Sequence, residues 1–186
     1  MPKRVPLESV SLPKRRLSYL GRSKMFGLML AVCMALVSVQ LCKPRLRLIW
    51  NASASVPIGL YWLEDGHEFK RDDLVLVWLP AAARQLAAQR AYLPADTPAV
   101  KRIAALAGDT VCAKNGVVRV NGRVAATTRP ADQVGRPLAS WQGCDLLASG
   151  QVFLLAEGSS MSFDGRYFGP SERRDIVGRL VLLWTL

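Results

Sequence analysis

A serine and a lysine are the residues of this sequence best suited to act as a nucleophile and its base. Ser55 lies in the segment Asn51–Tyr61, NASASVPIGLY. A serine hydroxyl is a weak nucleophile at neutral pH and needs a neighbouring base. The usual base is histidine, but the only histidine, His67, stands in the charged turn EDGHEF, which is typical of a surface position. The search for a base therefore moves to lysine, although Ser55 alone would also fit a polar turn before a strand.

Lys101 is the lysine whose neighbours suit that role. A lysine amine accepts a proton only if burial among apolar groups lowers its pKa far below about 10.4. Lys101 lies in the apolar segment AVKRIAALAGD. The alternation of a β-strand would turn Lys101 toward the apolar side and Arg102 toward water. The alternative is an exposed Lys-Arg pair on a strand.

A third segment, Ser162–Pro170 (SFDGRYFGP), offers supporting groups. The small hydroxyl of Ser162 is able to hold a lysine amine in place, as orientation of a base requires. Asp164 and Arg166 carry opposite charges and are expected to form a pair. The scattered acidic residues show no metal-ligand spacing and no phosphate-binding glycine loop appears, so neither a metal nor a cofactor is expected.

The order of these three segments resembles the Ser-Lys signal peptidase I family. That order is Ser-x-Pro after an apolar segment, Lys-Arg-Ile followed by Gly-Asp, and Ser-x-Asp-x-Arg-Tyr-Phe-Gly. The segment Ser55–Tyr61 and the Ala-rich segment that ends at Pro94 are similar to the TraF-type peptidases of conjugative plasmid transfer. The resemblance covers residues 25–186. One departure is Ala107, where the family often has proline, and we interpret it as a tolerated change in a turn.

The resemblance implies a role for each residue of the candidate site. Ser55 would attack the scissile carbonyl, and Lys101 would take its proton. Ser53 would match the hydroxyl of the oxyanion hole, acting beside the backbone N–H of Ser55. The residues that would orient Lys101 or brace that loop are Ser162, Asp164 and Arg166.

The function implied is that of a membrane-bound serine endopeptidase that processes exported precursors. The TraF-type resemblance favours the conjugative pilin as substrate, matured with or without cyclisation. One alternative is a general type I signal (leader) peptidase, and another is a non-catalytic membrane scaffold of a secretion channel. The partners expected are the exported precursor and inner-membrane lipids, and no nucleic acid.

An apolar run precedes the nucleophile and is expected to anchor it at a membrane. Met25 to Cys42 comprises 18 residues without a charge. As a helix it would span roughly 27 Å, which is enough for the hydrocarbon core of a bilayer. The sequence predicts a transmembrane anchor over 25–43, with a cleaved secretory signal and a buried core helix as the alternatives.

The distribution of charge predicts how the chain is oriented in the membrane, and the cysteines of the exported part predict a disulfide. Seven basic residues and one acidic residue precede Met25, so this tail carries over half of the formal net charge of +11. Such a bias predicts a basic cytoplasmic tail over 1–24 and an exported peptidase domain over 44–186. The location expected is the bacterial inner membrane, crossed once, with the catalytic domain in the periplasm. An oxidising compartment permits a disulfide, and we expect one between Cys112 and Cys144.

The remaining pattern predicts a mainly β fold: a signal-peptidase-like antiparallel β domain with one N-terminal transmembrane helix and a short helical insertion. Residues 1–24 show no apolar periodicity and are expected to lack regular structure. Asn115-Gly116 and Asn121-Gly122 predict two hairpins and hence a β-meander. The helical insertion is expected at Ala81–Ala91. The other strands are expected at Ile58–Leu63, Leu74–Leu79, Val100–Ala105, Val117–Val120, Val152–Leu155 and Ile176–Trp184.

Overall fold

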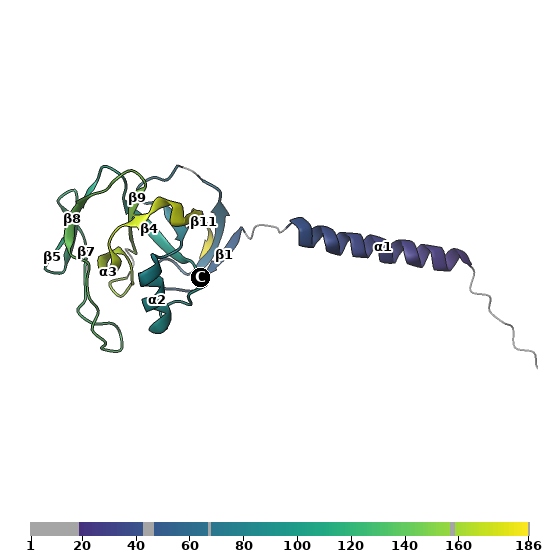
Figure 1. The fold of residues 1–186 in the computed structure, drawn as a ribbon, viewed down its shortest axis with the longest axis horizontal. Coiled ribbons are helices and arrows are strands. Elements are labelled where there is room, and N and C mark those ends of the chain that lie inside the picture. Colours follow the sequence, from purple (N-terminus) through teal and green to yellow (C-terminus); the bar gives the residue numbers. More distant parts are fainter. Residues whose placement is uncertain (1–18, 43–46, 67, 157–158, 186) are drawn as a thin grey trace, which may run out of the picture. The chain divides into compact units, whose positions relative to one another are not determined.

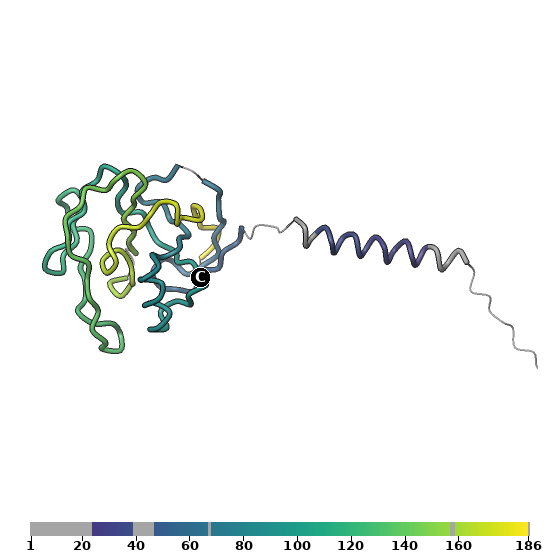
Figure 2. The backbone as a smooth tube through the Cα atoms, viewed as in Figure 1, coloured from purple at the N-terminus to yellow at the C-terminus, as the bar shows by residue number. Residues whose placement is uncertain are grey.

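The computed structural model describes residues 19–42, 47–66, 68–156 and 159–185 of the chain (Figures 1 and 2). Contacts between residues divide the chain into two compact units, Met1–Arg45 and Leu46–Leu186. The predictions for residues 1–18 and for His67 lie outside the described residues. All the candidate catalytic residues belong to the second unit.

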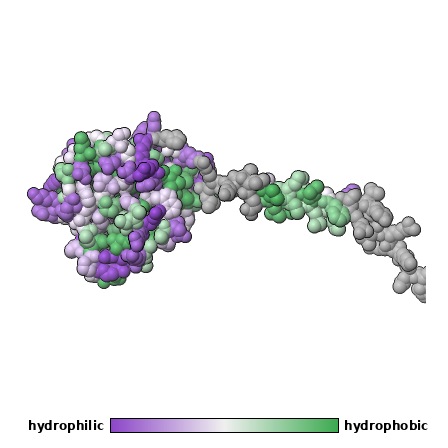
Figure 3. All heavy atoms as spheres, viewed as in Figure 1, coloured by the Kyte–Doolittle hydropathy of each residue, from purple (hydrophilic) through white to green (hydrophobic). Residues whose placement is uncertain are grey.

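The first unit contains the helix α1 (Tyr19–Cys42), whose apolar side chains between Met25 and Val37 are exposed (Figure 3). The expectation that residues 1–24 lack regular structure is wrong for residues 19–24, which are helical. They contain no proline, and Leu, Lys and Arg are good helix formers, so the helix continues through the charged flank. None of the described helical residues forms a segment with both the length and the hydropathy of a membrane span. The anchor over 25–43 stays a prediction.

The larger sheet of the second unit is antiparallel and has seven strands, in the order β1-β2-β11-β3-β4-β9-β10. The strands are β1 (Leu48–Asn51), β2 (Gly59–Glu64), β3 (Leu74–Val77), β4 (Ala99–Ala105), β9 (Gln151–Leu155), β10 (Ser171–Glu172) and β11 (Ile176–Thr185). The long strand β11 pairs with both β2 and β3. The last strand, β11, therefore lies beside β2, and β2 is the strand that follows the segment with Ser55.

A second, four-stranded sheet has the order β7-β6-β5-β8. Its strands are β5 (Thr110–Lys114), β6 (Val117–Val120), β7 (Arg123–Thr127) and β8 (Gly143–Leu146). Both Asn-Gly turns have positive φ at each of their two residues, as tight hairpin turns of this sequence require, so the predicted meander is confirmed. Cys112 and Cys144 face each other across β5 and β8 and form the predicted disulfide.

The two sheets share an apolar core. One buried cluster joins Val111 and Val118 of the small sheet to Phe153 and Leu155 of β9. The turn from β4 to β5 links the sheets, and the Asp109 N–H donates to the Leu106 carbonyl oxygen across it. Gly108, at φ +88°, supplies the conformation that a turn of this kind needs at its third position. Proline and alanine are both compatible with the second position, which is occupied by Ala107.

Three short helical segments complete the unit: α2 (Ala81–Gln89), α3 (Gly165–Phe168) and the 3₁₀ turn η1 (Arg173–Asp175). The predicted helical insertion is confirmed as α2, which ends two residues early because Ala91 has φ +57°. Its buried residues Ala83 and Ala87 pack near Phe163 and Phe168. The helix therefore supports the loop that carries Ser162.

The mainly β, antiparallel architecture is confirmed, and each of the six predicted strands is present to within two residues. The strands β1, β8 and β10 were not predicted, and β5 and β7 were predicted only as the outer strands of the meander. β1 and β8 have four residues each and β10 only two, so none carries enough alternation to be recognised from sequence.

Candidate active site

Ser55 lies in the turn between β1 and β2, and the buried side chain of Asn51 holds that turn in shape. The Asn51 Nδ2 atom lies within hydrogen-bonding distance of the carbonyl oxygens of Ser53 (2.9 Å), Val56 (3.2 Å) and Pro57 (3.1 Å). These contacts fix the backbone on both sides of the candidate nucleophile. The sequence analysis missed Asn51, because an asparagine before a serine turn gives no signal that it will be buried.

The first residue of β2, Gly59, has to be a glycine because β11 lies close against it. A Cβ at this position would lie 2.1 Å from the Trp184 carbonyl oxygen of β11. The Tyr61 hydroxyl donates to the Pro57 carbonyl oxygen at 2.7 Å, which pins the end of the turn to the sheet. The turn that carries Ser55 is thus tied at its end to β2, and β2 lies close against β11.

Lys101 lies in the middle of β4, between β3 and β9, and is buried with only 5% of its surface exposed. Its neighbour Arg102 is partly exposed and donates to the Asp72 carbonyl oxygen. The strand therefore alternates as the sequence predicted. The exposed Lys-Arg pair that stood as the alternative is excluded.

The Ser162 hydroxyl joins the two candidate catalytic side chains. Lys101 Nζ donates to Ser162 Oγ at 2.8 Å, and Ser55 Oγ lies 3.3 Å from the same oxygen. Ser55 and Lys101, both described by the structure, make no direct hydrogen bond to each other. The structure thus brings these three residues together, although Ser55 lies 107 positions and Lys101 61 positions before Ser162 in the chain.

The environment of Lys101 favours the uncharged amine. Burial lowers the pKa of Lys101 to about 8 from a usual value of 10.5. The negative charge of Asp164 acts in the opposite direction and the positive charge of Arg166 adds to the lowering. A substantial fraction of the amine is therefore neutral near pH 8, which a general base requires.

Asp164 and Arg166 form the predicted charge pair beneath Ser162. Both are buried, and the Arg166 guanidinium donates to the two carboxylate oxygens of Asp164 at 2.8 and 2.7 Å. Arg166 also donates to the carbonyl oxygens of Ser159 at 2.8 Å and Ser162 at 3.4 Å. Burial opposes the charge of Arg166, but the hydrogen bonds and charge of Asp164 outweigh it and raise its pKa. The pair therefore fixes the backbone that presents Ser162.

Ser53 occupies a different environment from the other site residues. Its hydroxyl donates to Asn51 Oδ1 at 3.0 Å, and its N–H donates to the same oxygen at 3.2 Å. The structure therefore does not bring Ser53 into a hydrogen bond with Ser55 or Lys101. To stabilise an oxyanion, its hydroxyl would have to turn away from Asn51.

A cavity of about 860 Å³ opens onto these residues. It is lined by Ser53, Ser55, Lys101 and Ser162, by the edge strand β1, and by the segments 90–93 and 129–138. It is large enough for several residues of an extended peptide. Within the part of the chain that the structure describes, His, Cys, Asp and Glu side chains form no group suited to hold a metal ion.

The chain is similar to signal peptidases and to proteins of plasmid transfer. The family model described as "Signal peptidase, peptidase S26" matches residues 21–185. Two Escherichia coli proteins named plasmid transfer protein TraF are each 34% identical, over 72% of this chain and 82% of their own length. The crystal structure of a signal peptidase I from Enterococcus faecalis V583 aligns with a TM-score of 0.39 at 17% identity, over 63% of this chain and 100% of that one.

The family model covers nearly the whole chain, including Ser55, Lys101, Ser162 and the strands that position them. The chain therefore belongs to the S26 family of signal peptidases.

Proposed function

We propose that this chain is a membrane-anchored serine endopeptidase that matures the pilin of a conjugative transfer apparatus. The observation that carries the proposal is a buried lysine amine and a serine hydroxyl that share one hydrogen-bonding partner, Ser162, inside a peptide-sized cavity. The two relatives named as plasmid transfer proteins support the conjugative substrate.

The reaction is an acyl transfer. Ser55 Oγ attacks the scissile carbonyl, and its proton moves to Lys101 through Ser162, which accepts the proton from Ser55 and gives its own to Nζ. The backbone N–H of Ser55 and the hydroxyl of Ser53, once released from Asn51, stabilise the oxyanion. Protonated Lys101 then gives a proton to the leaving amine. The resulting ester is broken by water, or by an amine of the pilin itself, which would yield a ring.

The membrane location is part of the proposal. It is supported by the uncharged run from Met25 to Cys42 and by the basic residues that precede it. A further support is an apolar surface on strands β1, β2 and β11, where Trp50, Trp62 and Trp184 are exposed. Tryptophan favours the boundary between lipid and water. Contact of this surface with lipid would hold the cavity close to a membrane-inserted precursor.

The rate of processing should depend on pH through Lys101. Since the base must be neutral, kcat/KM is expected to rise about tenfold per pH unit below pH 8 and to level off above it. The measurement is kcat/KM between pH 6 and 10 with the full chain in detergent. A profile that is flat over this range, or that still rises at pH 10, would exclude Lys101 with its lowered pKa as the base.

Co-expression with a candidate pilin precursor tests the proposed function. We expect wild type to convert the precursor to a shorter product and Ser55→Ala to leave it unprocessed. Mass spectrometry then identifies the nucleophile, because a product lighter than the linear peptide by one water is cyclic. Equal processing of a generic secretory precursor would favour a general leader peptidase. Pilus assembly that survives Ser55→Ala would favour a non-catalytic scaffold.

A further inference from the structure

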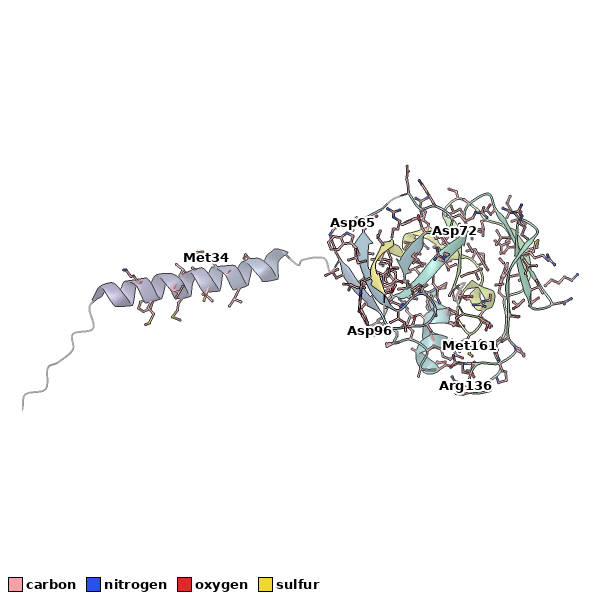
Figure 4. All side chains as sticks on the ribbon, turned by 180° about the vertical axis from the view of Figure 1, so that it is seen from behind. Met34, Asp65, Asp72, Asp96, Arg136 and Met161 are labelled. Carbon is pink, nitrogen blue, oxygen red and sulfur yellow. A yellow bond between two sulfur atoms is a disulfide. The ribbon has the colours of Figure 1, made fainter. Side chains whose placement is uncertain are left out.

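One wall of the cavity carries charges that the acyl-transfer chemistry does not use. This wall, called the arginine wall below, consists of residues 90–93 after α2 and of the loop 129–138. Three arginines in it line the cavity, namely Arg90, Arg129 and Arg136. Arg136 is labelled in Figure 4 on the same side of the domain as Met161, which lines the cavity next to Ser162.

Among the described residues that line the cavity, Asp132 is the one carboxylate, and its hydrogen-bonding partners lie within the arginine wall itself. It accepts hydrogen bonds from the Tyr92 hydroxyl, the Val134 N–H, and the N–H and Nε of Arg136. Burial acts in the opposite direction, but these hydrogen bonds hold the pKa of Asp132 well below its usual range. The wall therefore has a net charge of +2 at neutral pH.

Arg129 is the arginine of this wall that is available to a ligand. Its side chain is exposed, and within the described residues its guanidinium has no ion-pair or hydrogen-bond partner. Its backbone is held in place, because the Arg129 N–H donates to the Tyr167 hydroxyl at 3.2 Å. Two residues earlier, the Thr127 carbonyl oxygen accepts from Arg166 at 3.3 Å. Arg129 is thus tied to the same loop that presents Ser162.

A guanidinium with a fixed backbone and no internal partner is suited to bind a carboxylate through two parallel hydrogen bonds. We infer that the arginine wall binds an acidic group of the peptide substrate, within a few residues of the scissile bond, and that Arg129 is its main contact. The acidic group has to lie within a few residues of the scissile bond because the arginine wall and Ser55 line the same cavity. A basic side chain at that substrate position would be rejected. This inference rests on the proposed function, which supplies a peptide substrate.

The test measures peptide binding separately from cleavage. Full-length Ser55→Ala protein in detergent is titrated with fluorescent Ala-rich peptides that carry Glu, Gln or Lys at each position in turn. Each peptide is made with a free and with an amidated C-terminus, which distinguishes a side-chain carboxylate from a terminal one. At the recognised position we expect the acidic peptide to bind about tenfold more tightly than its neutral counterpart, and less so at high salt.

Charge reversal of Arg129 gives the decisive comparison. Arg129→Glu in the Ser55→Ala background should abolish the preference for the acidic peptide and favour the Lys peptide instead. Arg123→Glu makes the same change in net charge on exposed strand β7, outside the cavity lining, and should leave the preference unchanged. Equal binding of all the peptides, or a preference that survives Arg129→Glu, would overturn the inference. Absence of cleavage by wild type, with this preference intact, would count against the proposed function alone.

Discussion

Replacement of Lys101 by methionine is expected to abolish processing and, at neutral pH, to make the second unit harder to unfold. Methionine matches lysine in length and leaves the apolar surroundings filled, but it cannot accept a proton. Loss of a base that activates a serine costs on the order of 10⁴-fold or more in rate. The measurement is the rate of precursor processing by the full chain.

The gain in stability follows from the pKa of Lys101. Folding lowers this pKa from 10.5 to about 8, so the unfolded chain binds more protons between these two pH values. Stability therefore rises with pH in that window, and below pH 8 the buried charge costs about 3 kcal/mol. Lys101→Met escapes this cost. We expect it to be more stable than wild type by about 1–3 kcal/mol at pH 7 and to lose that advantage above pH 10.5.

Urea unfolding of both proteins at pH 7 and pH 10.5 measures this difference. The matched control is Lys114→Met, since Lys114 is an exposed lysine at the end of β5. It should retain activity and change the free energy of unfolding by less than about 0.5 kcal/mol. Retained processing in Lys101→Met would exclude Lys101 as the base. A difference in the free energy of unfolding that does not change with pH would show that protonation of Lys101 does not destabilise the folded state.

Local patterns in the sequence were sufficient to place the central strands. In β4, apolar residues lie two positions before and two positions after Lys101. This alternation predicted that Lys101 faces the apolar side, where its amine is buried. The Asn-Gly turns at 115–116 and 121–122 fixed the meander, because both residues of such turns tolerate positive φ. Each of these signals depends only on near neighbours in the chain.

The parts of the site that were missed depend on contacts between distant segments. Asn51 acts only when the turn after it folds back and presents three carbonyl oxygens to one amide group. In the arginine wall, Asp132 accepts hydrogen bonds from Tyr92 and from Arg136. No spacing in the sequence predicts that these two segments meet. Ser53, in contrast, was predicted from the resemblance to signal peptidases to act with Ser55 in an oxyanion hole, whereas its hydroxyl donates to Asn51.

Asp164→Asn should be the most destabilising conservative change near the site. It leaves the buried guanidinium of Arg166 without a counter-charge, and breaking such a pair costs about 3–5 kcal/mol. In a domain of this size the midpoint of thermal unfolding should fall by roughly 10–15 °C, as measured by circular dichroism. The control is Glu64→Gln, which breaks the Arg179–Glu64 pair at the surface, where the side chains are 44% and 39% exposed. It should cost less than about 1 kcal/mol.

The double variant Asp164→Leu/Arg166→Met separates stability from positioning. Removal of both charges eliminates the cost of an unpaired buried ion, so a large part of the lost stability should return. Processing should stay slow, because the carbonyl oxygens of Ser159 and Ser162 lose the donor that fixes the Ser162 backbone, and the hydroxyl between Ser55 and Lys101 loses its position. If activity returns together with stability, the Asp164–Arg166 pair serves the fold alone. If stability returns and activity does not, the pair is needed to orient Ser162 toward Lys101.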